Sequence, residues 1–561
     1  MMKDGRTQRE LLEAMRVEMR NERSTFDSHW RDLSDYILPR RTRFFTSDRN
    51  KGDKRNQKII DGTATLAART LSSGMMSGIT SPARPWFRLT TPDPDMAEFW
   101  SVKEWLDQVT RRMRDVMAQS NFYRALPTMY GDMGVFGTAA VMLLEDSDDV
   151  IRTANLPLGS YYAATNDRGH VDTFCREYQM TVRQIASAFG VESMSKTLRG
   201  MWEKGQYGEW VDVVHFVMPN DQWQQGKLIG KQSKRFKSCY YEAKSNDGEY
   251  LRESGFDDFP VLVPRWEVSG EDIYGTNCPG MSSLADIRSL QVYEKRSAQA
   301  VEKMINPPMT APTSLQSKKA SLLPGDITYI DVAQGQQGFR PAHEISFSID
   351  KVELKSDQIR QRISRSFYED LFLMLAQSDR REITAREIDE RHEEKLLMLG
   401  PVLEQINDDV LDPVIDRVFN IMMRGGLLPP APKELSGMSL RVEYVSIMAQ
   451  AQKLVATAGI ERFVQFAGQV AAVSGNPAVM DKVDIDQTID EYGEMLGVPA
   501  RIVRSDEDVA AMRQDRNEQA QAAQQAALAQ QQAATAKSLS QTNVTDDNAL
   551  TRLSKAMAGG V

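Results

Sequence analysis

The sequence predicts an α+β fold that is mainly helical and is built from several packed modules. Helical periodicity marks the start of the chain, its middle and most of its second half, whereas β-forming patterns fill residues 161–268. The chain has 561 residues, 41% of them hydrophobic, which is more than one core usually holds. We therefore expect a mixed first half followed by a largely helical second half.

Composition and charge restrict the class of protein. No apolar run approaches the roughly 20 residues of a membrane-spanning helix, and residues 1–23 are charged throughout, unlike a signal peptide. We therefore expect a cytosolic chain with no membrane partner. The formal net charge of -9 argues against a surface that neutralises many phosphates. A DNA partner stays open, because an acidic wall with a few guiding cations would let a duplex slide. Cys175, Cys239 and Cys278 are odd in number and far apart, which predicts buried free thiols.

The first half of the chain begins with helical patterns. Residues 1–38 carry apolar side chains every three or four positions, and Pro39 ends the pattern. A second helical stretch covers residues 97–117. Between them, residues 40–58 carry eight Lys or Arg against two Asp. This run fits contact with DNA or an acidic partner, but charge runs are more commonly exposed or inter-subunit loops.

A β-rich region follows. The segment before this β-rich region contains three glycines at intervals of three, Gly131, Gly134 and Gly137. Asn166-Asp167-Arg168-Gly169 separates two strand-like runs and predicts a turn. We expect further strands, most of them in one meander, at residues 139–144, 211–217, 236–244 and 259–268.

Two long helices then bracket a small insert. Residues 281–305 contain no Pro or Gly and keep helical spacing, which predicts a helix about 37 Å long. Residues 352–375 predict a second long helix, and the insert between the two is rich in Pro, Gly and β-formers. The apolar side chains of the second helix recur at every fourth position: Ile359, Ile363, Phe367, Leu371 and Leu375.

A polar stretch and an interrupted helical pattern come next. Residues 384–424 contain Gly400-Pro401 and Pro413, and we interpret them as one helix kinked near Pro401, because proline removes a backbone hydrogen bond. A proline-rich segment at residues 427–432 marks a module boundary. Residues 519–536 hold nine Ala, seven Gln and no charge, which fits either a long helix or a disordered tail.

The sequence offers no catalytic or metal-binding pattern. It has no GxxxxGK[ST] phosphate loop, no HExxH and no GxSxG, and its five histidines are isolated from one another. His392 stands beside Glu393 and Glu394, but adjacent helical residues point in different directions. The pair Asp408-Asp409 is interpreted as solvated helix surface. We therefore predict no enzyme activity, no cofactor and no metal.

Six groups of residues, spread over about residues 5–516, form a pattern through their order and spacing. They are Ile60-Asp61-Gly62-Thr63-Ala64 leading to Ser81-Pro82-Ala83-Arg84-Pro85-Trp86-Phe87; Tyr274-Gly275 with Pro279-Gly280-Met281; Leu399-Gly400-Pro401-Val402; Ile421-Met422-Met423-Arg424-Gly425-Gly426-Leu427-Leu428-Pro429-Pro430; Ala449-Gln450-Ala451-Gln452-Lys453; and Leu496-Gly497-Val498-Pro499. In this arrangement the chain resembles the head-to-tail connecting, or portal, family of short-tailed bacteriophages.

The resemblance implies the portal fold, in which wing, stem, clip and crown regions assemble as a ring, typically of twelve subunits. The order of predicted elements agrees with it. The implied regions are a mixed α/β wing at 1–279, a first stem helix at 280–305, a clip at 306–349, a second stem helix at 350–375, a tunnel loop at 376–383, a kinked wing helix at 384–428, and a crown with a C-terminal helical barrel or tail at 429–561.

The function implied is a DNA channel at a single capsid vertex. The terminase motor packages the genome through it, the genome later leaves through it, and the tail attaches to it. Implied partners are copies of the chain, double-stranded DNA, the terminase large subunit, the major capsid and scaffolding proteins and tail adaptor proteins. The implied location is the head–tail junction of the virion, after assembly in the host cytoplasm. The alternatives are another head-to-tail adaptor ring, a class usually smaller or richer in β structure, and a DNA-processing enzyme.

Two groups of residues are candidate DNA contacts. The tunnel loop is polar, carries both charge signs and lies between strongly helical stretches; its residues are Gln377, Ser378, Asp379, Arg380, Arg381 and Glu382. Contacts between these arginines and DNA phosphates would not depend on the DNA sequence. The alternative is that they pair with carboxylates of a neighbouring subunit. The second stem helix adds the candidate channel cations Lys351, Lys355, Arg360 and Arg362.

Overall fold

The computed structural model describes residues 7–48, 52–93, 99–224, 233–245, 250–310, 316, 340–341, 349–378, 399–435, 440–445, 463–475, 482–489, 506–540 and 552. The chain divides into two compact units. One comprises Met1–Pro92 and Trp105–Gly459, and the other comprises Asp93–Glu104 and Ile460–Val561. Helices and strands are mixed, as the predicted α+β class requires.

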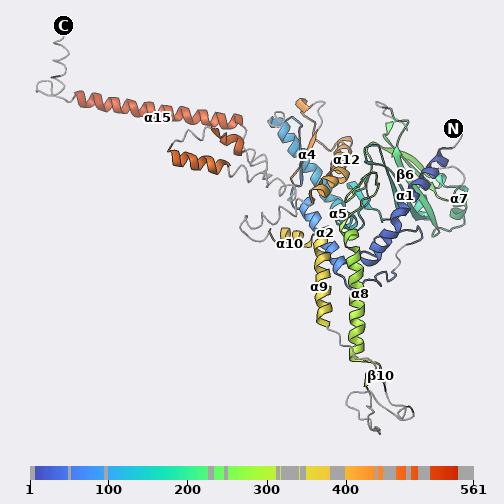
Figure 1. Cartoon of the computed structure of the whole chain (residues 1–561). Helices are drawn as coiled ribbons and strands as arrows, with labels where there is room; N and C mark the ends of the chain where they lie inside the picture. Colours follow the sequence, from blue (N-terminus) through green and yellow to red (C-terminus); the bar gives the residue numbers. More distant parts are fainter. Residues whose placement is uncertain are drawn as a thin grey trace, which may run out of the picture. The chain divides into compact units, whose positions relative to one another are not determined.

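A five-stranded antiparallel sheet forms the β-rich part of the first unit (Figure 1). Its strands follow the chain order of a meander: β4 (Tyr161–Thr165), β5 (Val171–Thr181), β6 (Trp210–Pro219), β7 (Phe236–Glu242) and β8 (Arg252–Phe256). The predicted turn lies between β4 and β5, where the Asn166 side chain accepts hydrogen bonds from the amides of Arg168 and His170 at 3.0 and 3.1 Å. Gly169 there has a φ of 78°, which glycine adopts at little cost.

Helices cover both faces of this sheet. The first helix, α1 (Gln8–Tyr36), buries Leu12 and Met19 in a core with Phe216 and Tyr241. Two short helices, α6 (Val182–Phe189) and α7 (Lys196–Glu203), build a second core on Val213. Sequence patterns did not predict α6 and α7, although a capping box at Thr181, with Gln184 three positions later, begins the first of them.

A second, three-stranded sheet corrects one prediction. Its order is β3 (Val150–Asn155), β2 (Val141–Asp146) and β9 (Val261–Leu262). The strand expected at residues 259–268 is therefore only two residues long, and it pairs with β2 rather than extending the meander. Pro260 and Pro264 flank β9, and proline has no N–H for a ladder.

Two packed helices were also missing from the sequence prediction. They are α2 (Thr63–Ile79) and α5 (Phe122–Phe136), and α5 contains Gly131 and Gly134. A Cβ at Gly134 would overlap the Leu71 side chain, so the glycine allows α2 and α5 to pack closely. The next predicted helix is confirmed as α4 (Trp100–Gln119). Strand β1 (Phe87–Thr90) pairs with the distant β12 (Arg441–Tyr444).

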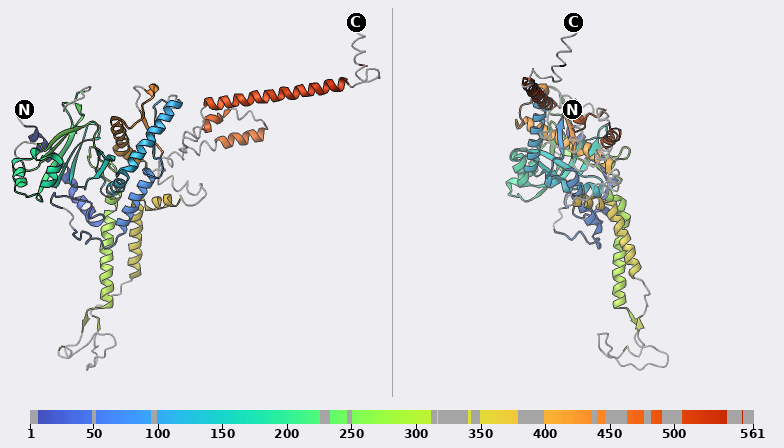
Figure 2. Two further views of the ribbon diagram at one scale, coloured as in Figure 1. Left: turned by 180° about the vertical axis from the view of Figure 1, so that it is seen from behind. Right: turned by 90° about the vertical axis from the view of Figure 1, so that its left-hand side faces the viewer.

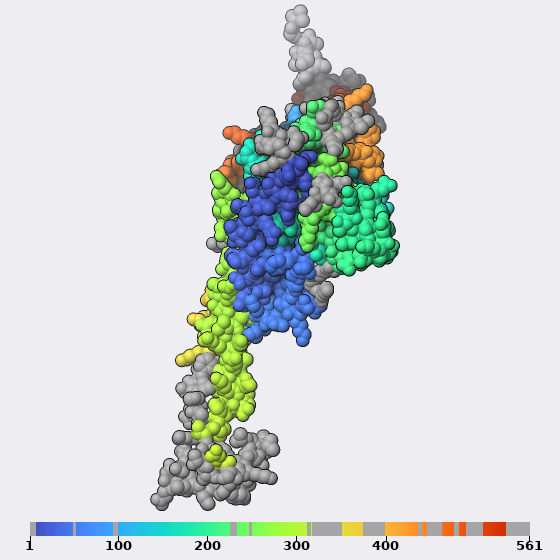
Figure 3. All heavy atoms as spheres, turned by 90° about the vertical axis from the view of Figure 1, so that its right-hand side faces the viewer, coloured from blue at the N-terminus to red at the C-terminus, as the bar shows by residue number. Residues whose placement is uncertain are grey.

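The two long helices that bracket the insert project side by side from the rest of the first unit (Figures 1 and 2). They are α8 (Pro279–Ile305) and α9 (Ile349–Ser366). A space-filling view shows α8 extending away from the blue N-terminal part of the chain (Figure 3). Beyond the helices, β10 (Met309–Thr310) pairs with β11 (Arg340–Pro341) at the base of the insert. Most of the predicted clip lies outside the described residues.

The single helix predicted for residues 352–375 is broken. After α9 the backbone turns at Tyr368, which has a φ of 54°, and α10 (Glu369–Ser378) begins. The kink predicted near Pro401 stays a prediction, because the described residues resume only at residue 399. A distortion that was not predicted, a π-helical turn at Asn407–Leu411, lies between helical residues 399–406 and α12 (Asp412–Arg424). Pro413 has no N–H to donate to the carbonyl four residues earlier, which favours this wider turn.

The second unit is helical in its described parts. Its longest element is α15 (Asp506–Ser540), which contains the Ala/Gln segment, so that segment forms a helix. Arg513 binds Asp486 through two hydrogen bonds of 2.5 and 2.8 Å within the unit. Across the described parts of both units, no helix has the length and apolar character that crossing a bilayer would require. The three cysteines are free and buried, as predicted.

Candidate functional site at the paired helices

The paired helices α8 and α9 pack side by side, and their buried side chains follow the apolar spacing that predicted them. Leu284, Ile287 and Leu290 of α8 are buried, as are Ile359 and Ile363 of α9. Residues three or four apart lie on one side of a helix, so these buried side chains form an apolar stripe on each helix. Farther along α8, none of the described residues 292–305 is buried.

Two arginines of α9 bind carboxylates of this same chain. Arg362 donates to Asp286 of α8 through two hydrogen bonds of 2.6 and 2.9 Å. Arg360 donates to Glu294 of α8 at 2.8 Å and to Asp61 at 2.9 Å. The hydrogen bonds from Arg362 lower the pKa of Asp286, which keeps that carboxylate charged. These contacts fix α9 against α8.

Asp61 connects the helix pair to α2. One carboxylate oxygen accepts from the Thr63 amide at 2.8 Å in a turn just before α2, while the other accepts from Arg360. Burial opposes the charge of Asp61, but the hydrogen bonds from Thr63 and Arg360 outweigh it and lower the pKa. Gln291 of α8 accepts from the amides of Ile60 and Asp61 at 2.6 and 2.8 Å and donates to the Asp61 carbonyl at 3.0 Å. The motif at residues 60–64 is therefore the place where α2, α8 and α9 meet.

Contacts with α5 and with the sheet also fix the first residues of α8. Gly280 packs on the backbone of Val135, where any Cβ would overlap the Val135 carbonyl. Just before the helix, the Tyr274 hydroxyl accepts from the Ala163 amide at 3.0 Å, and its ring contacts Trp30 with centroids 5.3 Å apart. The sequence motifs Tyr274-Gly275 and Pro279-Gly280 thus anchor the projecting helix to the sheet and to α5.

One carboxylate of the pair Asp408-Asp409 is not solvated surface, which corrects that interpretation. The side chains of Asp409 and Arg265 are 5% and 3% exposed. The Asp409 carboxylate accepts three hydrogen bonds from Arg265. The donors are the backbone amide at 3.2 Å, Nε at 3.0 Å and Nη2 at 2.8 Å. This ion pair fixes the π-helical turn to the loop after β9.

The predicted DNA contacts are only partly described. Gln377 and Ser378 are the last residues of α10, so they belong to a helix rather than to a loop. The other four tunnel-loop residues lie outside the described residues, as does the His392 region: Asp379, Arg380, Arg381 and Glu382. Lys351 and Lys355 lie exposed on α9.

The partners of Arg360 and Arg362 were missed at the level of sequence. Asp286 and Glu294 lie eight residues apart on one predicted helix, which places them about two turns apart on one side. That spacing was the available signal for ion pairs with a second helix. Nothing in the spacing pointed to Asp61, which is distant in sequence.

In the described part of the basic run at residues 40–58, several cations are paired within the chain. Lys58 binds Asp35 at 2.6 Å, and Arg55 donates to Asp48 at 3.0 Å. Arg41 lies 3.5 Å from the buried Asp132. These contacts favour a loop that is bound to the rest of the chain over a loop whose cations are available to DNA phosphates.

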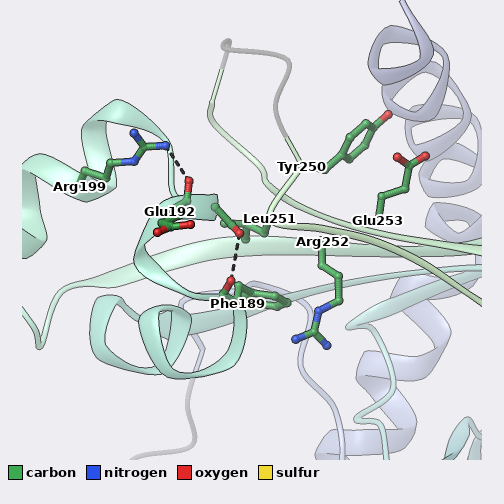
Figure 4. A pocket seen from close by; sticks show the side chains of 8 residues that line it. Phe189, Glu192, Arg199, Tyr250, Leu251, Arg252 and Glu253 are labelled. Carbon is green, nitrogen blue, oxygen red and sulfur yellow. Dashed lines mark hydrogen bonds between the residues drawn. The ribbon is translucent and has the colours of Figure 1, made fainter.

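A surface hollow of about 620 Å³ lies beside the edge strand β8 (Figure 4). Two arginines at its wall bind backbone carbonyls, Arg199 to Glu192 at 2.8 Å and Arg252 to Ala188 at 2.5 Å, so they serve the local fold. The hollow is lined by Phe189, Glu192, Ser193, Arg199, Tyr250, Leu251, Arg252 and Glu253. In the described part of the chain, no three His, Cys, Asp or Glu side chains gather as a metal site requires.

Comparison with known proteins decides the family. The family model described as bacteriophage head to tail connecting protein matches residues 9–503. The chain belongs to this family. This head-to-tail connecting protein is 49% identical over 550 residues to the portal protein of Salmonella phage epsilon15, with 98% of each chain covered. It is 44% identical over 553 residues to the probable portal protein of Bordetella phage BPP-1, with 99% of each chain covered. The family resemblance predicted from sequence motifs is confirmed.

Proposed function

We propose that this chain is the portal subunit of a short-tailed phage, and that copies of it form the ring-shaped DNA channel at one capsid vertex. The observation that carries the proposal is the match to two portal proteins over nearly the whole chain. The paired helices support it, because two helices projecting from a mixed α/β body suit a stem around a channel. The names of the relatives also favour a portal over another adaptor ring or a DNA-processing enzyme.

The regions of the proposed portal follow the elements of the chain. The body up to residue 279 is the wing, α8 and α9 are the stem, and the insert that begins with β10 and β11 is the clip. Residues 376–383 are the tunnel segment, residues 384–428 the kinked wing helix, and residues 429–561, which contain α15, the crown and C-terminal part. The two-stranded base of the insert suits a clip that gains its order from neighbouring subunits.

The exposed surface of the stem supports assembly as a ring. Val292 and Tyr293 of α8 are 48% and 36% exposed, Ile305 is 80% exposed, and Leu354 of α9 is 62% exposed. Apolar side chains on two bare helices would be covered by the stems of neighbouring copies in a closed ring of head-to-tail contacts. We infer a ring of twelve from the family.

The charge pattern suits a channel that holds DNA weakly. Arg360 and Arg362 are bound to carboxylates, so Lys351 and Lys355 are the better candidates among the four proposed channel cations. Phosphate contacts through a few lysines are sequence-independent and salt-sensitive, and the net charge of -9 limits their total strength. Arg380 and Arg381 would add contacts in the tunnel segment.

The remaining partners follow from the family. We infer that the terminase large subunit and later the tail adaptor proteins bind the clip end, and that the major capsid and scaffolding proteins surround the wing. The ring would be a virion component at the head–tail junction, assembled in the host cytoplasm. That the chain has no enzyme activity stays a prediction.

Electron microscopy of the purified full-length protein tests the proposal. We expect rings with a central hole wide enough for duplex DNA, about 20 Å, and no cleavage of DNA in the presence of divalent metal. A matched variant, Ile305→Glu with Leu354→Glu, places charge on the exposed stem surface and should weaken ring formation without unfolding the subunit. A protein that stays monomeric at all concentrations, or that cuts DNA, would contradict the proposal.

A further inference from the structure

A helical sequence pattern continues through a place where the helix itself is broken. Ile359, Ile363, Phe367 and Leu371 follow one another at intervals of four, and the interval continues to Leu375. In one continuous helix each of these side chains would neighbour the next, and together they would form an apolar stripe that winds slowly around the helix. Instead α9 ends at Ser366 and α10 begins at Glu369, and Figure 1 shows α10 leaving the axis of α9.

The break rests on a strained residue. Tyr368 has a φ of 54°, a left-handed conformation in which a Cβ crowds the following carbonyl. Its amide donates to the carbonyl of Arg365 at 3.0 Å, three residues back rather than four, and its ring lies 6.3 Å from that of Trp266. The left-handed conformation disfavours tyrosine about fivefold or more relative to glycine, so surrounding contacts must hold it.

Contacts on both sides of Tyr368 hold the bend. Before it, Arg360 and Arg362 fasten α9 to α8 through Glu294 and Asp286. After it, Phe372 of α10 is 3% exposed and packs on α2 at Gly74. A Cβ at Gly74 would overlap the Phe372 ring, so α10 can occupy this place only because position 74 has no side chain.

We propose that Tyr368 is a two-state joint between α9 and α10. In the bent state described here, Phe372 packs on Gly74 and Tyr368 is left-handed. In the straight state, Tyr368 becomes right-handed, α10 leaves α2, and α9 and α10 form one helix on the unbroken apolar interval. Straightening loses the packing of Phe372 on α2 and relieves the strain at Tyr368. The joint is a property of the chain and does not rest on the proposed function.

Electron spin resonance can measure the two states in the full-length protein. Spin labels at Glu353→Cys on α9 and Leu373→Cys on α10 would lie about 30 Å apart along a continuous helix and closer together in the bent state. Both positions are exposed, and the three native cysteines are buried and would not be labelled. Diluting labelled chains with unlabelled chains removes distances between subunits. We expect a major short distance and a minor long one.

Three substitutions test the cause. Tyr368→Gly removes the left-handed penalty and adds the cost of glycine to a straight helix, so the long-distance fraction should fall at least about fivefold. Gly74→Ala should raise that fraction by displacing Phe372. Gly131→Ala, where the new Cβ would meet Ser72 at an ordinary 3.4 Å, is the control and should leave it unchanged.

Phe372→Ala removes the same packing from the other side and replaces Gly74→Ala if that variant does not fold. A single short distance in the parent and in every variant would show a fixed bend and overturn the proposal.

Discussion

Replacing Asp409 with asparagine should destabilise the first unit more than most single substitutions can. The Arg265 guanidinium would lose its charged partner while its side chain is 3% exposed, and asparagine would turn an NH₂ group or its single oxygen toward donors that now bind a carboxylate. Removing one partner of a buried ion pair typically costs about 3–5 kcal/mol, mostly because the other charge stays buried. We expect a loss of that size in the free energy of unfolding for Asp409→Asn.

Chemical denaturation followed by circular dichroism, at one protein concentration, measures the effect. Asp408→Asn is the matched control, because this neighbouring carboxylate is exposed and should change stability by less than about 0.5 kcal/mol. The double variant Asp409→Leu with Arg265→Met, which removes both charges, should recover most of the loss. Equal stabilities of the Asp408→Asn and Asp409→Asn proteins would refute the reasoning.

Three further predictions concern pH, DNA and the tail. Burial raises the pKa of Asp132 to about 7, against the attraction of Arg41, so the folded protein holds a proton that the unfolded chain releases and stability falls as pH rises from about 4 to 7. Asp132→Asn should therefore be more stable than the parent at pH 8, by up to about 4 kcal/mol, with the gain vanishing toward pH 4, as pH-dependent unfolding would show. Changing Arg380 and Arg381 to alanine should leave rings intact and reduce packaged or retained DNA; failure to form rings would instead indicate inter-subunit pairing. Truncation after Asp515 should also preserve rings in electron micrographs, and their loss would show that the Ala/Gln helix drives assembly.

Local sequence patterns predicted the helices that bury only one side and leave the other side in solvent. The helices α1 and α8 and the turn at Asn166 were predicted correctly because each is set by residues close in sequence. The spacing in α9 predicted a helix but not where it ends. Helix α5 escaped because its residues are buried on nearly every side, so no polar face marks its period. The break at Tyr368 could not be predicted, because the interval of four continues through it and its cause, the space above Gly74, lies almost 300 positions earlier in the chain.

The sequence predicted where the paired helices lie in the chain, but it predicted only in part what their charged side chains bind. The order of the motifs gave the family, and helical spacing gave the helix pair. Whether a charged side chain faces DNA or a carboxylate depends on which surfaces the fold brings together. Arg360 and Arg362 illustrate this, since both carry the charge of a channel cation and both bind carboxylates from other elements. For the same reason, Asp408 and Asp409 could not be told apart by sequence.

The pairing of β1 with β12 sets an order of events during synthesis. Arg88 and Glu443, joined across these strands at 2.6 Å, lie 355 positions apart in the chain. At typical rates of translation, about 20–70 s pass between the appearance of one and of the other. Throughout that time β1 has no β12 to pair with, and a lone strand edge invites pairing with other chains. A nascent chain therefore cannot complete the pairing of β1 until almost four-fifths of its residues have been made.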